Sequence, residues 1–173
     1  MLLDDPARYK LGGAVIRLEP MDEAAYERWQ ATSIPEYAQE KVEAGAWLES
    51  EALERSAQSY RELLPDGLET PGHVIRSIVN EVDERVGYVW WAPRDQPSGR
   101  VAFIYDIAVY PDHRRRGYAQ AALAEVEAWA RVHGCVGVQL HVHGANAGAR
   151  QLYQRAGFVE TDVTMLKLVA SDS

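Results

Sequence analysis

The chain has 173 residues, of which 47% are hydrophobic and 25% are charged, and its net charge is −8 at pH 7. This length and composition predict one globular domain spanning residues 1–173, and the acidic balance argues against a general nucleic-acid-binding protein. No apolar run approaches the roughly 18 residues of a membrane span, and the amino terminus lacks the basic and hydrophobic regions of a signal peptide. Since the single cysteine, Cys135, also rules out an internal disulfide framework, we expect a cytoplasmic protein without a membrane or nucleic-acid partner.

The first part of the chain is expected to contain one strand and two helices. Residues 14–18 form a short apolar strand. Residues 22–46 are mostly helix-forming, and a break is expected near Pro35 because proline disfavours helix at the preceding residue. A second helix is better defined, since apolar residues recur at helical spacing over residues 53–64 after Ser50, a plausible N-cap.

The rest of the chain alternates strands and helices. Strands are predicted at residues 74–79, 86–91 and 101–109, and the last of these is nearly continuously apolar, as in a sheet covered on both faces. The remaining elements are expected as a helix from Ala119 to its closing Gly134, a strand over 136–142, a helix over 146–156 and a final strand over about 158–169. The order β-α-α-β-β-β-α-β-α-β predicts an α/β fold, a mixed sheet with helices on both faces.

The segment from Ile107 to Ala119 indicates a ligand class. An apolar strand leads through a proline-marked turn into three arginines, a glycine and a helix start. The first amides of a helix lack intrahelical partners and the helix dipole favours anions, so this layout is typical of a phosphate site. A solvated basic patch is the alternative interpretation. Neither the Walker string G-x-x-x-x-G-K-[ST] nor the dinucleotide string G-x-G-x-x-G is present.

Two motifs in this half of the chain resemble a known family. The first is Arg114-x-x-Gly117-x-Ala119, preceded by Val109-x-Pro111, and it resembles the R/Q-x-x-G-x-G/A signature of the GNAT superfamily of acetyl-CoA-dependent N-acetyltransferases. The second resembles that family's next motif and reads Asn146-x-x-Ala149-x-x-Leu152-Tyr153-x-x-x-Gly157-Phe158. The resemblance covers residues 73–168, the expected cofactor-binding core, whereas residues 20–70 are the variable acceptor-side segment.

The resemblance implies how acetyl-CoA would bind. Amides from Arg115 to Gln120 would wrap the pyrophosphate, and Gly117 would let the backbone approach the phosphates without a Cβ in the way. The strand before the turn would pair with the pantetheine arm, and Asn146 would contact the pantetheine or phosphate region while capping its helix. The implied cofactor-binding residues are Ile107, Ala108, Val109, Arg114, Arg115, Arg116, Gly117, Tyr118, Ala119, Gln120, Asn146 and Tyr153.

Acetyl transfer to an amine needs a neutral nucleophile, and an amine of pKa about 10.4 is almost fully protonated at pH 7. Asp106 is the first candidate for a general base, since an unpaired carboxylate in an apolar strand is costly; a structural ion pair or an exposed residue facing the turn is an equal alternative. Glu81 and Asp83 are runners-up that also fit a solvated hairpin turn, and a water relay would need none of the three. Tyr153 matches the family's tyrosine that protonates the coenzyme A sulfur, although its place on an apolar helix stripe also fits core packing.

Two further clusters admit other interpretations. His141 and His143 lie two apart on a predicted strand, but the sequence holds no C-x-x-C or H-E-x-x-H spacing, so we predict no metal site. His143 could instead line the cofactor cleft. Glu36, Glu40 and Glu43 recur near helical spacing and form either a solvent-exposed face or a rim that attracts a cationic acceptor.

Together these features predict an enzyme that moves an acetyl group from acetyl-CoA to the primary amine of a small molecule or peptide. We expect direct attack in a ternary complex, because no cysteine or serine is placed to form an acyl-enzyme. Two alternatives remain open: a non-catalytic acyl-CoA-binding or regulatory module on the same fold, and a transferase of a longer acyl group. The sequence leaves open the acceptor and the choice between monomer and homodimer.

Overall fold

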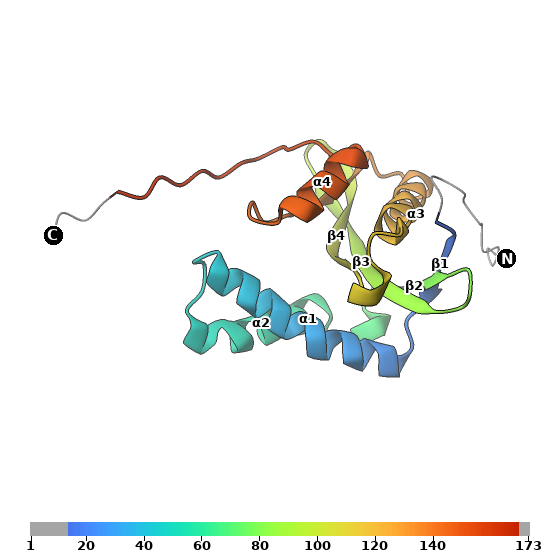
Figure 1. The fold of residues 1–173 in the computed structure, drawn as a ribbon, viewed down its shortest axis with the longest axis horizontal. Helices are drawn as coiled ribbons and strands as arrows, with labels where there is room; N and C mark the ends of the chain where they lie inside the picture. Colours follow the sequence, from blue (N-terminus) through green and yellow to red (C-terminus); the bar gives the residue numbers. More distant parts are fainter. Residues whose placement is uncertain (1–13, 170–173) are drawn as a thin grey trace.

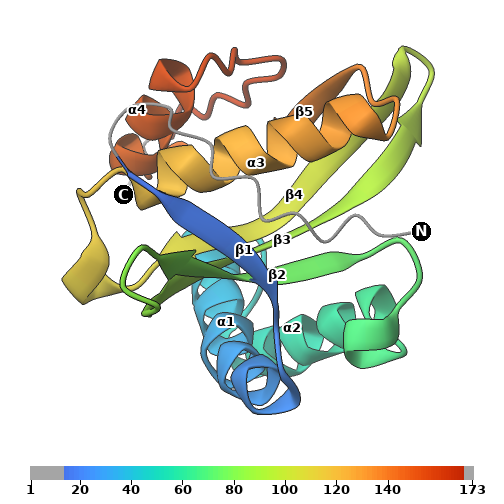
Figure 2. The ribbon, with the colours of Figure 1, turned by 90° about the vertical axis from the view of Figure 1, so that its right-hand side faces the viewer.

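The computed structural model describes residues 14–169, in which a five-stranded sheet of order β1-β2-β3-β4-β5 separates two layers of helices. Helices α1 and α2 cover one face and α3 covers the other (Figures 1 and 2). Strands β1 to β4 are antiparallel to their neighbours, whereas β5 runs parallel to β4. The elements are β1 (Ile16–Pro20), α1 (Glu23–Glu43), α2 (Glu49–Leu63), β2 (Val74–Asn80), β3 (Arg85–Gln96), β4 (Gly99–Val109), α3 (Tyr118–Val132), β5 (Gly137–Leu140) and α4 (Ala147–Arg155), with short 3-10 turns at Gly67–Glu69 and Pro111–His113. Over residues 14–169, no helix has both the length and the apolar character required to cross a membrane.

Helix α1 runs unbroken through Pro35, so the predicted break is wrong. Proline inside a helix costs about 3 kcal/mol because it removes a hydrogen bond and crowds the preceding turn. Tertiary contacts offset this cost: Trp29 and Ser33 are buried before the proline, and the Ser56 hydroxyl of α2 donates to the Ile34 carbonyl at 2.7 Å. Packing against α2 and the sheet therefore holds the helix together where its local sequence favours a break.

The core is divided by the sheet into an aromatic side and an aliphatic side. Facing α1 and α2, the rings of Trp29 and Trp90 meet edge to face with centroids 5.4 Å apart, and Trp90 stacks on Tyr105 at 4.6 Å. Facing α3, the core is mainly aliphatic, with Val126 and Val89 fully buried, and it also holds the edge-to-face pair of Trp91 and Trp129. The buried residues of α3 face the sheet and are Tyr118, Ala121, Ala122, Leu123, Val126 and Ala130.

Strands β4 and β5 diverge, and this divergence opens the candidate site. Strand β5 pairs only with residues 101–104 of β4. Within the described chain, residues 106–109 of β4 have a strand partner on the β3 side alone. The register of β3 and β4 shifts so that Tyr105 has no partner, which is the geometry of a β-bulge. Bulges bend a strand and re-aim its side chains, often next to functional sites.

The final predicted strand, over residues 158–169, does not form in the structure. After α4 the Phe158 amide still donates to the Tyr153 carbonyl at 2.9 Å, but residues 159–169 are assigned to no strand and run outward from the molecule (Figure 1). The apolar residues that suggested a strand are exposed rather than paired; Met165, for example, is 89% exposed. A strand needs a neighbouring edge as well as a suitable pattern, and here the segment lies against none.

Candidate active site

The turn between β4 and α3 has the backbone geometry of an anion site. Gly117 is the N-cap of α3 with φ 84°, and Arg115 also has a positive φ, 61°. For an arginine this conformation costs energy, and such strain is typical of functional turns. Within residues 14–169, the amides from Arg115 to Gln120 have no protein acceptor. A run of free amides at a helix start can bind phosphate.

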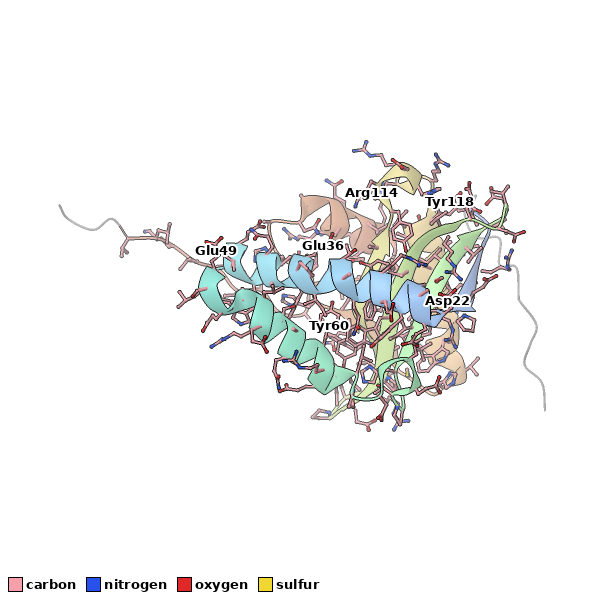
Figure 3. All side chains as sticks on the ribbon, turned by 90° about the horizontal axis from the view of Figure 1, so that it is seen from below. Asp22, Glu36, Glu49, Tyr60, Arg114 and Tyr118 are labelled. Atoms are coloured by element: carbon pink, nitrogen blue, oxygen red, sulfur yellow. The ribbon has the colours of Figure 1, made fainter. Side chains whose placement is uncertain are left out.

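The arginine side chains of this turn are exposed and are free of carboxylates in the described chain. Arg114 Nε donates to the Val109 carbonyl at 3.0 Å, and an Arg116 guanidinium nitrogen donates to the Asp112 carbonyl at 3.2 Å. Figure 3 shows Arg114 and Tyr118 at one edge of the molecule, beyond α1. Cations at the positive end of a helix dipole are unfavourable by themselves, so the arrangement favours an anionic ligand.

The other residues predicted to bind the cofactor differ in whether their side chain or only their backbone is accessible to a ligand. Tyr118 is only 6% exposed and packs among Ile16, Ile78 and Ala122, so its side chain belongs to the core. Ala119 is partly buried and Gln120 is exposed. The side chains of Ile107 and Val109 pack toward α3 and that of Ala108 packs toward α1, which leaves their backbone as the part available to a ligand. The cofactor-binding role of this group stays a prediction.

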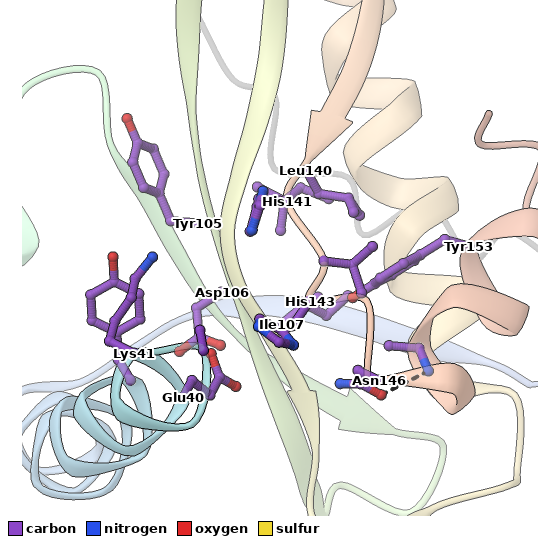
Figure 4. Close-up of a pocket in the computed structure, with 15 residues that line it drawn as sticks. Glu40, Lys41, Tyr105, Asp106, Ile107, Leu140, His141, His143, Asn146 and Tyr153 are labelled. Atoms are coloured by element: carbon purple, nitrogen blue, oxygen red, sulfur yellow. Dashed lines mark hydrogen bonds between the residues drawn. The ribbon is translucent and has the colours of Figure 1, made fainter. Parts of the chain in front are cut away.

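A cavity of about 170 Å³ lies where β4 and β5 diverge (Figure 4). It brings together four of the predicted site residues, Asp106, Ile107, Asn146 and Tyr153, whereas the segment from Arg114 to Gln120 lies outside it. Its walls come from α1, from β4, from the end of β5 and from the start of α4. The remaining lining residues are Tyr37, Glu40, Lys41, Ala44, Ile104, Tyr105, Leu140, His141, Val142, His143 and Ala149.

Asp106 is a partly buried carboxylate that α1 holds in place. The indole Nε1 of Trp29 donates to Asp106 Oδ2 at 3.1 Å. Burial raises the pKa of Asp106 to about 6, although hydrogen bonds from Trp29 and Ser33 act in the opposite direction. Asp106 is therefore largely ionised at neutral pH and yet basic enough to accept a proton there, as a general base must be.

Glu40 stands next to Asp106 and makes this side of the cleft acidic. Figure 4 shows the two side chains together on the wall formed by α1 and β4. Partial burial and the charge of Glu36 raise the pKa of Glu40. Glu36, Glu40 and Glu43, expected to form either a solvent-exposed face or a rim, are all exposed, and of the three Glu40 lines the cavity. Two neighbouring carboxylates favour a cation between them.

Tyr153 approaches the cleft from the opposite side, on α4. Figure 4 shows its hydroxyl end reaching into the cleft, while the ring packs on Phe158 with centroids 5.7 Å apart. Tyr153 therefore packs against its neighbours and also lines the cleft. Burial raises the pKa of the phenol, and the charges of Asp106 and Glu40 raise it further. The hydroxyl therefore keeps its proton at neutral pH.

Asn146 and His143 line the same end of the cleft. The Asn146 side chain accepts a hydrogen bond from the Ala149 amide at 3.1 Å, which confirms it as the N-cap of α4. His143 lines the cavity, as predicted from its position before the second motif. His141 also lines it, but the described residues include no cluster of three or more His, Cys, Asp or Glu that could hold a metal ion.

The two runner-up bases, Glu81 and Asp83, lie away from the cavity. Trp29, in contrast, contacts Asp106 but was not among the residues predicted from the sequence. Asp83 pairs with Arg17 at 2.6 Å in the hairpin between β2 and β3, and neither Asp83 nor Glu81 lines the cavity. Trp29, which orients Asp106, lies 77 residues before it in the chain. No local motif connects two residues so far apart, so only the fold could reveal the pair.

Comparison with known proteins agrees with this geometry. The sequence profile of the Acetyltransferase (GNAT) family matches residues 25–158. The chain is 40% identical over 152 residues to YycN, an uncharacterized N-acetyltransferase of Bacillus subtilis (strain 168), covering 88% of this chain and 97% of that protein. The crystal structure of YycN matches with a TM-score of 0.82 at 39% identity, covering 90% of this chain and 99% of that one.

A more distant match is informative about the fold alone. The structure of AAC(6')-Iy, in complex with the bisubstrate analogue CoA-S-monomethyl-acetylneamine, has a TM-score of 0.57 at 20% identity, covering 90% of this chain and 97% of that one. The family profile covers most of the chain, and the YycN relative is matched over nearly its whole length. The chain therefore belongs to the GNAT family of acetyltransferases.

Proposed function

We propose that this protein transfers the acetyl group of acetyl-CoA to the primary amine of a cationic acceptor, by direct attack within a ternary complex. The observation that carries the proposal is the pair of groups facing each other across one cleft, the basic carboxylate of Asp106 and the protonated phenol of Tyr153. A base on one wall and an acid on the other are what acetyl transfer to an ammonium group requires.

Coenzyme A would bind along the open side of β4. The free amides from Arg115 to Gln120 and the neighbouring arginines would hold its pyrophosphate. The backbone beyond Tyr105, which has no β5 partner in the described structure, would pair with the amides of the pantetheine arm. This path leads from the anion site at the start of α3 to the cavity, where the thioester would lie between Asp106 and Tyr153.

The acceptor would enter on the acidic wall. Its ammonium group would be attracted by Glu40 and Asp106, and Asp106 would remove one proton to give the neutral amine. The amine nitrogen then attacks the acetyl carbonyl carbon, the carbon–sulfur bond breaks, and Tyr153 gives its proton to the departing thiolate. The amide nitrogen loses its second proton, which restores the tyrosine through solvent. The products are the acetylated amine, free coenzyme A and one released proton.

The proposal is tested by measuring thiol release from acetyl-CoA over a panel of polyamines, aminoglycosides, simple amines and peptides, with mass spectrometry of the acceptor. We expect turnover with cationic primary amines, and we expect Tyr153→Phe to lower kcat by about 10²–10⁴-fold. Tyr110→Phe is a matched control, because Tyr110 is 41% exposed and lies outside the cavity lining.

Two results would contradict the proposal. Binding of coenzyme A without turnover of any amine would favour a regulatory module on the same fold. Faster turnover with longer acyl-CoA donors than with acetyl-CoA would identify a different acyltransferase.

A further inference from the structure

The bulge in β4 places an aromatic ring directly beside Asp106. Consecutive residues of a regular strand point to opposite faces of the sheet. Here Tyr105, which the register shift leaves without a partner in β3, packs against the aromatic core on the α1 side, and Asp106 bonds to Trp29 on the same side. Figure 4 shows both side chains on the same side of β4 as α1. The bulge therefore gives the cleft an adjacent ring and carboxylate, and both line the cavity.

The Tyr105 ring is held in place from behind. It stacks on Trp90 with ring centroids 4.6 Å apart and an interplanar angle of 19°. Trp90 is 2% exposed, and its indole Nε1 donates to His73 Nδ1 at 2.9 Å. The Tyr105 ring also meets that of Phe103 edge to face, with centroids 4.9 Å apart. Tyr105 itself is only partly buried. A ring supported in this way loses little conformational freedom when a ligand packs against it.

A second ring lines the cleft from α1. Tyr37 is partly buried and meets Trp47 and Tyr60 edge to face, with centroids 5.5 and 6.3 Å apart. Like Tyr105, it lines the cavity. The acidic wall of the cleft, formed by α1 and β4, therefore carries two aromatic rings as well as two carboxylates.

Lys41 limits the charge that this wall can accept. Its ammonium nitrogen lies 5.1 Å from the centroid of the Tyr37 ring, and it forms no ion pair with any residue from 14 to 169. Lys41 also lines the cavity. One ammonium group of an acceptor can pair with Asp106 or Glu40, whereas a second would meet the like charge of Lys41. The wall therefore favours an acceptor with one positive charge over a polycation.

We propose that the acceptor is a primary amine with a single positive charge, joined by a short linker to an aromatic ring, and that Tyr105 selects it. This inference rests on the proposed acetyl transfer and names the class of its acceptor. The ammonium group lies at Asp106, and the ring of the acceptor packs on Tyr105. The linker is short because neighbouring Cα atoms of a chain are only about 3.8 Å apart. Contacts between aromatic rings favour such an acceptor beyond the apolar area that it buries.

The first test compares two amines that differ in aromaticity. 2-Phenylethylamine and 2-cyclohexylethylamine have the same charge and linker, but only the first has an aromatic ring. In the wild type, kcat/KM should favour 2-phenylethylamine by about 2–10-fold. Tyr105→Leu should abolish this preference by raising KM for the aromatic amine, whereas Tyr105→Phe, which keeps the ring, should retain it. Tyr110→Leu is the control and retains the preference, because Tyr110 lies outside the cavity lining.

Two results would overturn the proposal. One is a wild type that turns over both amines equally well, a measurement that requires no variant to fold. The other is a Tyr105→Leu variant that keeps the full preference for the aromatic amine.

The second test examines the role of Lys41 with spermidine as a polycationic acceptor. The wild type should have a lower kcat/KM for spermidine than for 2-phenylethylamine, and Lys41→Met should raise the value for spermidine about fivefold or more. Lys167→Met is the matched control, because Lys167 is exposed outside the cavity lining. A wild type that prefers spermidine would identify a polycationic acceptor and refute the inference.

A binding measurement separates this inference from the proposed acetyl transfer. Titration calorimetry of 2-phenylethylamine into the protein saturated with coenzyme A involves no reaction, because no acetyl group is present. We expect 2-phenylethylamine to bind about 2–10-fold more tightly than 2-cyclohexylethylamine, and Tyr105→Leu to bind the two equally. This pattern without turnover of any amine would contradict the acetyl transfer and support the aromatic site. Turnover of amines without ring-dependent binding would contradict the aromatic site alone.

Discussion

Asp106 shows how a single carboxylate can be kept basic by its surroundings. Burial raises its pKa from 3.8 to about 6, and the Trp29 indole fixes one of its oxygens. The native protein thus holds a proton between these two pH values that the unfolded chain has released. Stability contributed by this group is therefore present at low pH and falls as the pH rises from about 4 to 6.

This linkage gives a prediction for Asp106→Asn, which removes the titration but keeps an oxygen to accept from Trp29. The difference in unfolding free energy, variant minus wild type, should grow with pH across this range by at most about 3 kcal/mol. Urea unfolding at several pH values measures it. Taking the difference cancels the opposite contributions of Asp22 and Asp95, whose pKa values are lowered by hydrogen bonds from Arg85 and Arg100. A difference that does not change between pH 4 and 6 would show that Asp106 is not desolvated.

At the scale of the elements, the junction of α1 and α2 depends on one buried hydroxyl. Ser56 is fully buried and donates to the Ile34 carbonyl, next to the proline inside α1. Ser56→Ala should destabilise the protein by about 1–3 kcal/mol, because the partly buried Ile34 carbonyl loses the hydrogen bond from the Ser56 hydroxyl. Ser59→Ala is the control in the same helix, since Ser59 is only partly buried and its hydroxyl donates to the Arg55 carbonyl of its own helix. Equal losses of urea-unfolding free energy in the two variants would contradict this role of Ser56.

The start of α3 offers a second prediction at this scale. Gly117 has φ 84°, and a Cβ there would come within 3.4 Å of Ala14 Cβ, beside the amides proposed to bind pyrophosphate. Gly117→Ala should weaken coenzyme A binding at least about tenfold in calorimetry, because it strains the backbone that presents those amides.

Gly134→Ala is the matched control at the other end of α3. Gly134 has a comparable φ of 68° and open space around it. Both variants should lose stability, but only Gly117→Ala should lose affinity for coenzyme A. Equal affinities in the two variants would refute the anion site at the start of α3.

At the scale of the whole molecule, the parts that the sequence predicted well are those set by neighbouring residues. The motif from Arg114 to Ala119 and the cap at Asn146 depend on contiguous backbone, and the structure has the turn and the cap where the spacing put them. The contact between Trp29 and Asp106 joins residues far apart in the chain, and no periodicity reports it. The continuity of α1 through Pro35 likewise depends on α2.

The last part of the described chain also shows that a sequence pattern does not determine tertiary contacts. Residues 158–169 have the pattern of a strand, but pattern alone does not supply the edge that a strand needs. Local sequence thus specified much of the element order. The packing that sets the pKa of Asp106 depends on contacts distant in sequence.

The proposed mechanism requires Asp106 to act as the base for an ammonium acceptor, and the pH dependence of kcat/KM for amine acetylation shows whether it does. For the wild type we expect the rate constant to rise with pH to an apparent pKa of about 6 and then to stay level up to the acceptor's own pKa of about 10. Asp106→Asn should lose the level region and rise steadily toward the acceptor pKa, with a rate about 10²–10⁴-fold lower at pH 7. A steady rise without a level region in the wild type, or the same level region in Asp106→Asn, would contradict the assignment.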